Sequence, residues 1–505
     1  MGHRRIQGYP RLRLISALYT DAKLGDWVVS PSRISSQTLA SRTLHCATAP
    51  VGSQLFDLSD PYVKAFRIFL FSWIVVQTFY FGIYGPDLLF LKQIRPHDVL
   101  FVLTLVSFLL AWVGGKTVPS RMEWPERLLL LLGGIFVASF VFRGAAFDET
   151  TSKKWLGTLL NFTVYPFSTY FFVRAFSYRK EFVVGVLKVI CFLGIYLAIT
   201  GVFEHYQPLN ALVWPGYIMD PGLGSHFERS RGPFMESVAM GRVLTMSFAC
   251  WLVLRLEAGP FLRKVAIFSI PVTVASIYFV ATRGPWMGFA LVCLIFLAFE
   301  TPVRRTMRRL IICTLIAAAL GVGSKFSIGE SNLFLKRQST VTDRMVTWLV
   351  SGRMVEANPL LGVGYGRFNV EWPNYYKEFQ GFDFTGFDGS HNTLLTMAAE
   401  EGLPTLGLYF LMAFLMWRRC FRVYRQLDPG LTFERTFVVM VMGILLLYVV
   451  TGWFSDLRWN TLQNTLIFLM LGLVAAMERD LCNKAIVAGE DDLDQTPELV
   501  ATYYQ

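Results

Sequence analysis

The chain has 505 residues, of which 54% are hydrophobic and only 16% are charged. In soluble domains, about a quarter of the residues are normally charged. The present composition therefore excludes an ordinary soluble enzyme and indicates an integral membrane protein. The formal net charge is +11, but Lys and Arg cluster between apolar segments, as expected of membrane loops and not of a nucleic-acid binder. The seven cysteines show no metal-ligand spacing, so no zinc site or disulfide framework is predicted.

The chain opens with residues 1–60, which are basic, rich in Ser and without the apolar core of a cleavable signal peptide. We expect them to form a poorly ordered cytoplasmic extension. A membrane-spanning helix requires roughly 20 apolar residues. Beyond residue 60, apolar segments of about this length recur along the chain. The sequence therefore predicts an all-α integral membrane protein with about twelve transmembrane helices, at approximately 65–84, 97–113, 127–143, 155–173, 182–203, 236–254, 264–281, 285–300, 308–325, 394–417, 435–453 and 459–477.

Basic residues set the expected orientation. Every second connection holds at least three Lys or Arg, which places these connections and both termini in the cytoplasm. The longest outer connection is too long for an idle linker and is a candidate functional element. The expected organisation is an N-terminal extension, helices 1 to 9, a large periplasmic loop, helices 10 to 12 and an acidic cytoplasmic tail, at 1–60, 61–325, 326–393, 394–480 and 481–505.

Three arginines are predicted at the outer rim. Arg229 and Arg231 precede the sixth helix in "HFERSRGPFMES", and Arg283 lies in the tight turn "VATRGPW". The planar guanidinium fork stays charged and matches phosphate oxygens, so arginines converging on one cavity suit a diphosphate. The alternative is that a rim arginine such as Arg283 only extends its head group to the membrane interface.

His391 lies at the outer end of the tenth predicted helix, in "GSHNTLLTMAAEEGLP". An imidazole titrates near neutral pH and accepts a proton from an attacking hydroxyl. The alternative is a structural hydrogen bond at the start of a helix. Ser390 and Asn392 are equally good candidates for the N-cap of that helix.

A break signal follows in Gly402-Leu403-Pro404. It predicts a short helix over 391–401, with the membrane span itself beginning near Leu403. Glu400 and Glu401 then lie two to three turns beyond His391, where either one could orient a basic side chain. The alternative is that the two carboxylates only satisfy loop groups.

The outer loop carries a glycine-rich run, Gly362-Val-Gly364-Tyr-Gly366, which lacks the spacing of a nucleotide-binding fingerprint. Its glycines permit positive φ or close backbone packing. Upstream, Arg344 lies on an amphipathic helix expected on the outer surface, with Met345, Trp348, Leu349 and Met354 on its apolar period. No metal site is predicted, because the acidic pairs are loosely spaced or lie in the cytoplasmic tail.

The succession "RGPF", "TRGPW", "NPLLGVGYGRF" and "HNTLLTMAAEEGLPTLGLYF" among about twelve spans resembles one protein family. It is the O-antigen ligase and O-antigen polymerase superfamily of bacterial inner-membrane glycosyltransferases. The likeness covers roughly residues 60–480 and is strongest over 225–415. It implies a GT-C-type multi-helix fold with a large helical periplasmic loop and an active site that faces the periplasm.

The resemblance also implies the chemistry and the partners. The donor would be a glycan on undecaprenyl diphosphate, transferred with inversion and without metal or cofactor to a sugar hydroxyl. The acceptor would be lipid A core in a ligase, or a growing O-antigen or exopolysaccharide chain in a polymerase. Carried over by motif, His391 would be the catalytic base. Arg231 and Arg283 would bind the donor diphosphate, with Arg229 and Arg344 as weaker candidates. Glu401 and Asn392 would be supporting residues.

A second class of function stays open. A transporter of lipid-linked glycans or other solutes would need paired charges and broken helices near the membrane midplane. The polar groups identified here gather at one rim, which favours an enzyme that binds membrane-borne substrates and no nucleic acid.

Overall fold

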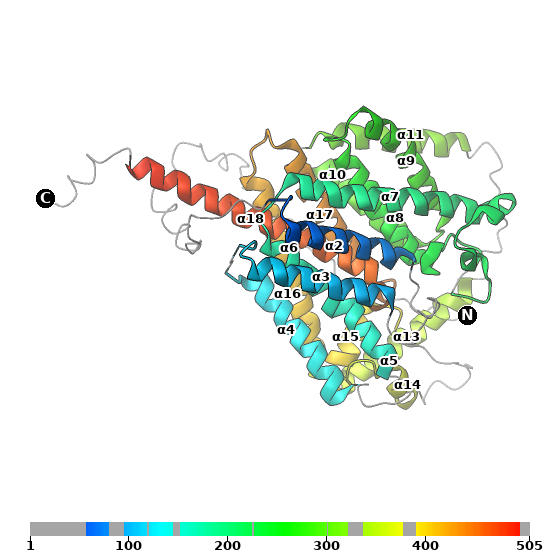
Figure 1. The fold of residues 1–505 in the computed structure, drawn as a ribbon. Helices are drawn as coiled ribbons and strands as arrows, with labels where there is room; N and C mark the ends of the chain where they lie inside the picture. Colours follow the sequence, from blue (N-terminus) through cyan, green and yellow to red (C-terminus); the bar gives the residue numbers. More distant parts are fainter. Residues whose placement is uncertain are drawn as a thin grey trace, which may run out of the picture. The chain divides into compact units, whose positions relative to one another are not determined.

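The computed structural model describes residues 57–79, 95–118, 121–144, 152–224, 227–299, 301–321, 337–376 and 390–494, and every regular element among them is a helix (Figure 1). The chain divides into two compact units. The larger unit, Ala49–Val487, holds the helices and the candidate site described below, and the smaller one combines Met1–Thr48 with Ala488–Gln505. Of the predicted N-terminal extension 1–60, only residues 57–60 are described, and of the predicted loop 326–393, residues 326–336 and 377–389 lie outside the described residues.

The principal helices follow the predicted order. They are α2 (Pro61–Phe79), α3 (Pro96–Val113), α4 (Trp124–Ala138), α5 (Ser152–Leu159), α6 (Tyr165–Ala175), α7 (Lys180–His205), α8 (Ser237–Leu254), α9 (Pro260–Phe279), α10 (Arg283–Ala298), α11 (Val303–Gly321), α13 (Arg337–Ala357), α14 (Phe368–Tyr376), α15 (Thr393–Glu401), α16 (Leu403–Gln426), α17 (Thr432–Thr451) and α18 (Thr461–Asp494). Short π-helical turns extend α4 to Arg143 and join α5 to α6, and a 3-10 turn, η6 (Leu457–Trp459), precedes α18.

Among the described residues, seven helices are long and apolar enough to cross a membrane, namely α2, α3, α4 with its extension, α7, α8, α9 and α17. The apolar helix α10 is shorter. The other predicted spans, 155–173, 308–325, 394–417 and 459–477, are not among the seven, although their described residues are largely helical. The all-helical, multi-pass membrane organisation of the described chain is therefore confirmed, whereas the count of about twelve spans stays a prediction.

Helix α8 forms the centre of the bundle, since every one of its residues is buried. Helices α7, α9, α10 and α17 pack against it (Figure 1). Peripheral helices expose large apolar side chains instead, as α3 does with Val102, Val106 and Leu110. Such exposure is unfavourable in water but suits a helix whose neighbour is lipid.

The segment predicted as one span over 394–417 contains two helices. Gly402 has φ of 86°, which ends α15 and starts α16. Pro404 lies in the first turn of α16, where its missing N–H costs nothing. The break signal therefore marks a real boundary, and α15 packs with α13 and α14 at one end of the bundle (Figure 1).

A buried ionic cluster joins α4, α6, α16 and α18. Arg419 donates from Nε to the Glu478 carboxylate at 2.7 Å and from Nη2 to Glu123 at 3.1 Å, and it also pairs with Glu126 and Tyr170. The cluster lies roughly 24 Å along α16 from the end of α15. It ties four helices together away from the candidate site.

Replacing Arg419 by Met should destabilise the protein by about 3 kcal/mol, because the Glu126 and Glu478 carboxylates would stay buried without their cation. Thermal unfolding of the detergent-solubilised protein measures this loss. Arg418→Met is the matched control, since Arg418 is the exposed neighbour on the same helix. Equal unfolding temperatures for the two variants would contradict the structural role of the cluster.

Candidate functional site

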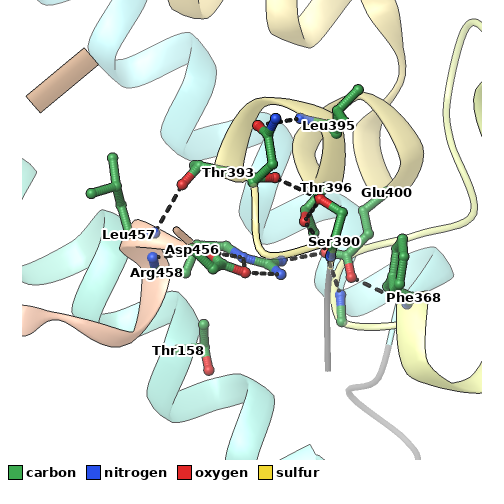
Figure 2. A network of polar contacts seen from close by, with 12 residues as sticks. Thr158, Phe368, Ser390, Thr393, Leu395, Thr396, Glu400, Asp456, Leu457 and Arg458 are labelled. Atoms are coloured by element: carbon green, nitrogen blue, oxygen red, sulfur yellow. Dashed lines mark hydrogen bonds and ion pairs between the residues drawn. The ribbon is translucent and has the colours of Figure 1, made fainter. Parts of the chain in front are cut away.

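The segment 452–460, between α17 and α18, holds the start of α15 in place. The backbone N–H of Thr393 donates to the Gly452 carbonyl at 2.8 Å, and its hydroxyl donates to the Ser455 carbonyl at 2.9 Å. The same hydroxyl accepts from the backbone N–H of Leu457 at 2.8 Å (Figure 2). One threonine therefore fixes the first turn of α15 by three hydrogen bonds.

The same segment contacts the starts of two further helices. A Cβ at Gly284, in the first turn of α10, would lie 3.3 Å from the Cβ of Phe454. Asn460 donates to the carboxylate of Glu236, the N-cap position of α8, at 3.0 Å. The first residues of α8, α10 and α15 thus gather around 452–460, so the predicted convergence of three distant segments occurs at one end of the bundle.

The His391 backbone is held in an unusual conformation. Its φ is 54°, a left-handed value that few residues other than glycine adopt. Its neighbours Ser390 and Asn392 are fully buried, while the His391 side chain is exposed. Such strain persists only where the surroundings enforce it, and it is frequent at functional sites.

The surroundings of His391 explain this conformation. Asn392 is the N-cap of α15, because its Oδ1 accepts from the backbone N–H groups of Leu394 at 3.0 Å and Leu395 at 3.2 Å. The Ser390 hydroxyl donates to the Asn392 carbonyl at 2.8 Å and lies 2.9 Å from the Thr396 hydroxyl (Figure 2). These buried contacts fix both flanks and direct the imidazole outward.

Arg283 is the first residue of α10 and is exposed, as the rim prediction requires. It acts electrostatically on Arg344 of α13, which is half-buried. Burial lowers the pKa of Arg344, and the like charge of Arg283 adds to that effect. Two guanidiniums from distant segments thus lie close enough to repel each other, an arrangement that a bound anion would stabilise.

Helix α13 also reaches the histidine turn. Thr347, one turn after Arg344, lies 3.5 Å from the Ser390 carbonyl. The apolar face of this helix differs from the prediction, because Val346, Val350 and Met354 are buried whereas Met345, Trp348 and Leu349 are exposed. Only Met354 of the predicted set packs inward, so α13 presents apolar side chains on its outer side.

Arg231 does not reach an open surface. Its side chain is fully buried, and its guanidinium donates to the Leu223 carbonyl, to Ile218 at 2.7 Å and to Asp220 at 3.0 Å. It also stacks over the Phe227 ring at 4.9 Å. Through these contacts Arg231 holds the segment 218–223, so few of its guanidinium N–H donors remain for a ligand.

Arg229 is better placed than Arg231 to act beside Arg283. Arg229 is half-buried, and its Nη1 lies 3.5 Å from the Thr282 hydroxyl, directly before Arg283. In the sequence, the "RGPF" match made Arg231 the stronger candidate for contact with the donor diphosphate. The structure reverses that order, since burial and backbone contacts take up the Arg231 donors.

The glycine-rich run caps the far end of α15. The backbone N–H groups of Val363 and Gly364 donate to the carbonyls of Ala399 at 2.9 Å and Glu400 at 2.8 Å. Gly362 has φ of 62°, and a Cβ there would lie 2.2 Å from the carbonyl carbon of Glu400. The predicted use of these glycines for positive φ and close packing is confirmed.

Glu400 is the carboxylate that pairs with a basic group. It forms an ion pair with Arg458 of η6 and accepts from the backbone N–H groups of Gly366 at 3.0 Å and Phe368 at 3.1 Å (Figure 2). Arg458 also donates to Asp456 at 2.8 Å. The predicted supporting carboxylate was Glu401, so the observed pairing falls one residue earlier.

Glu401 is buried, and its Oε1 has no hydrogen-bond partner among the described residues. Burial raises the pKa of Glu401 well above its ordinary value, and the neighbouring Glu400 charge raises it further. Sequence reasoning missed Arg458 and Asp456. Their one signal is a charged pair in "FSDLRWN", a short connection between two apolar segments.

The arrangement can bind an anion and transfer a proton. Arg283 and Arg344, with Arg229 beside them, supply positive charge, and the exposed imidazole of His391 stands at the start of α15. No group of three metal-ligating side chains occurs within the part of the chain that the structure describes. The site is therefore built from cationic side chains, an imidazole and a buried polar support.

A comparison with protein families matches residues 268–410 to the family described as O-antigen ligase. The matched region covers just over a quarter of the chain and includes Arg283, Arg344, His391 and Glu400, but not Arg229. A comparison with curated proteins gave no match. The family match agrees with the resemblance seen in the sequence motifs over these residues.

Proposed function

We propose that the protein is a membrane glycosyltransferase that moves a glycan from undecaprenyl diphosphate to a sugar hydroxyl. The observation that carries the proposal is the convergence of Arg283, Arg344 and the strained His391 at one end of the bundle. Cations that lie close together suit a diphosphate, and an exposed imidazole suits a hydroxyl proton. The family match supports the same class of reaction.

The proposed reaction assigns a role to each group. The acceptor hydroxyl attacks the anomeric carbon of the donor, and His391 accepts its proton. The carbon–oxygen bond to the diphosphate breaks, with inversion, and the charge that develops on the diphosphate is stabilised by Arg283, Arg344 and Arg229. Undecaprenyl diphosphate is then the leaving group, without a metal or cofactor in the reaction, and Arg231 holds the loop beside Arg229.

The proposed topology follows the basic connections. About twelve spans in a bacterial inner membrane would place both termini in the cytoplasm and the arginine and histidine turns at the periplasmic face. Residues 326–393 would form the periplasmic loop that shapes the acceptor site, between helices 1–9 and 10–12. The acidic segment 481–505 would be a cytoplasmic tail.

Two acceptors fit this reaction. A ligase would use lipid A core, and a polymerase would extend an O-antigen or exopolysaccharide chain. Deletion of the gene and electrophoresis of the surface glycans separates them, because a ligase mutant loses ligated long chains whereas a polymerase mutant keeps single-repeat products. Unchanged glycans, with a substrate moved but no bond made or broken, would favour the transporter alternative.

We expect His391→Ala and Arg283→Ala each to reduce glycan transfer by at least 100-fold, on the order of the effect of removing a general base or a charge-stabilising donor. Complementation of the deletion strain and immunoblotting of membranes measure transfer and expression.

Arg263→Ala is the matched control, since Arg263 is exposed in the first turn of α9, away from the convergent turns. Transfer that survives in both test variants at normal expression would overturn the proposed mechanism.

Arg229 and Arg231 should behave differently when replaced by Ala. Arg229→Ala should weaken binding of undecaprenyl diphosphate by about tenfold, as expected for a lost charge-assisted hydrogen bond, with an unchanged unfolding temperature. Arg231→Ala should lower stability by about 3 kcal/mol, because three backbone carbonyls lose their donor. Lipid titration and thermal unfolding of the purified protein measure both effects, and the reverse pattern would restore Arg231 as the donor contact.

A further inference from the structure

A second arginine of α8 has no role in the proposed mechanism. Arg242 is fully buried in the central helix, and none of its Nε, Nη1 and Nη2 atoms has a hydrogen-bond partner among the described residues. An ionised side chain buried in a membrane bundle is costly, so it is retained where an opposite charge or a ligand compensates it. The surroundings of Arg242 therefore identify the group whose charge it compensates.

Two carboxylates act on Arg242, those of Glu236 and Asp456. Asp456 already accepts from Nε of Arg458 at 3.0 Å and from its Nη2 at 2.8 Å. The Glu236 carboxylate has a single hydrogen bond among the described residues, from Asn460 at 3.0 Å. The positive charge of Arg242 is thus available mainly to Glu236.

Glu236 lies half-buried where α8 begins. Burial raises its pKa, and Arg242 is the strongest influence that opposes this rise. Arg242 therefore favours the ionised carboxylate, although Glu236 stands in partly desolvated surroundings.

Glu236 is joined to the cations of the candidate site through its neighbour in the chain. The next residue, Ser237, lies 3.1 Å from the Thr282 hydroxyl, which is 3.5 Å from Nη1 of Arg229. Glu236 makes no ion pair with any arginine in the described residues. An ionised carboxylate in this place accepts hydrogen bonds from O–H or N–H groups and offers none to a phosphate.

We propose that Glu236, held by Asn460 and compensated by buried Arg242, binds a hydroxyl or amide N–H of the sugar ring attached to the donor diphosphate. The inference rests on the proposed function and deepens it, because it makes Glu236 a residue that selects the donor sugar. The arginines would bind the diphosphate of every donor, whereas Glu236 would bind only a donor that carries a suitable polar group.

Two lipids test this division of roles in the purified full-length protein in nanodiscs: undecaprenyl diphosphate, and the same lipid carrying N-acetylglucosamine. Glu236→Ala should weaken binding of the sugar-bearing lipid by about tenfold and leave binding of the sugar-free lipid unchanged. Glu236→Gln, which keeps a neutral acceptor, should lie between Ala and the unchanged protein. Glu228→Ala, an exposed carboxylate of the preceding segment, is the control.

If Glu236→Ala weakens binding of both lipids equally, or weakens binding of neither, the inference is overturned and the proposed function still stands. Failure of the unchanged protein to bind either lipid would overturn the proposed function, and the inference with it. The two failures are therefore distinguishable.

The role of Arg242 is tested by a double-mutant cycle. Arg242→Met should lower the unfolding temperature and weaken binding of the sugar-bearing lipid. In a Glu236→Gln background, the same substitution should have a much smaller effect on both, because no carboxylate is left to compensate. Additive effects of the two substitutions would show that Arg242 does not serve Glu236.

Discussion

The candidate site depends on one buried carboxylate, that of Glu400. It accepts from two backbone N–H groups of the glycine-rich loop and pairs with Arg458, so it joins α15, the outer loop and η6 in one contact set. In a medium of low dielectric constant, loss of any partner would leave a charge or a dipole uncompensated. The orientation of α15, which carries the His391 turn roughly 13 Å away at its other end, follows from this carboxylate.

The two longest motifs of the sequence are therefore two sides of one structural contact. The run from Gly362 to Gly366 lies against the last turn of α15, where positive φ and the absence of a Cβ allow backbone to touch backbone. Side chains that carry chemistry lie elsewhere, at the first turns of helices. The glycine-rich motif thus supports the proposed site, whose proposed functional groups are the arginines and His391.

Much of this could be predicted from the sequence, because hydrophobic length, break residues and caps act locally. The helices, the boundary at Gly402 and the position of His391 at a helix start follow from neighbouring residues, whereas the choice of Asn392 over Ser390 as the cap does not. The roles of Arg231, Arg458 and Arg242 do not, since each depends on partners brought together by packing. Even the choice between Glu400 and Glu401 required the fold, because adjacent residues of a helix point about 100° apart.

The left-handed backbone at His391 has a consequence for which residues this position tolerates. Asparagine adopts that conformation with little strain, whereas a β-branched residue does not. A chain with asparagine here would keep the geometry of the turn and lose only the imidazole, while one with valine would lose both. The tolerated residues at position 391 are thus limited first by backbone geometry, and the proposed role as a proton acceptor would select histidine from that short set.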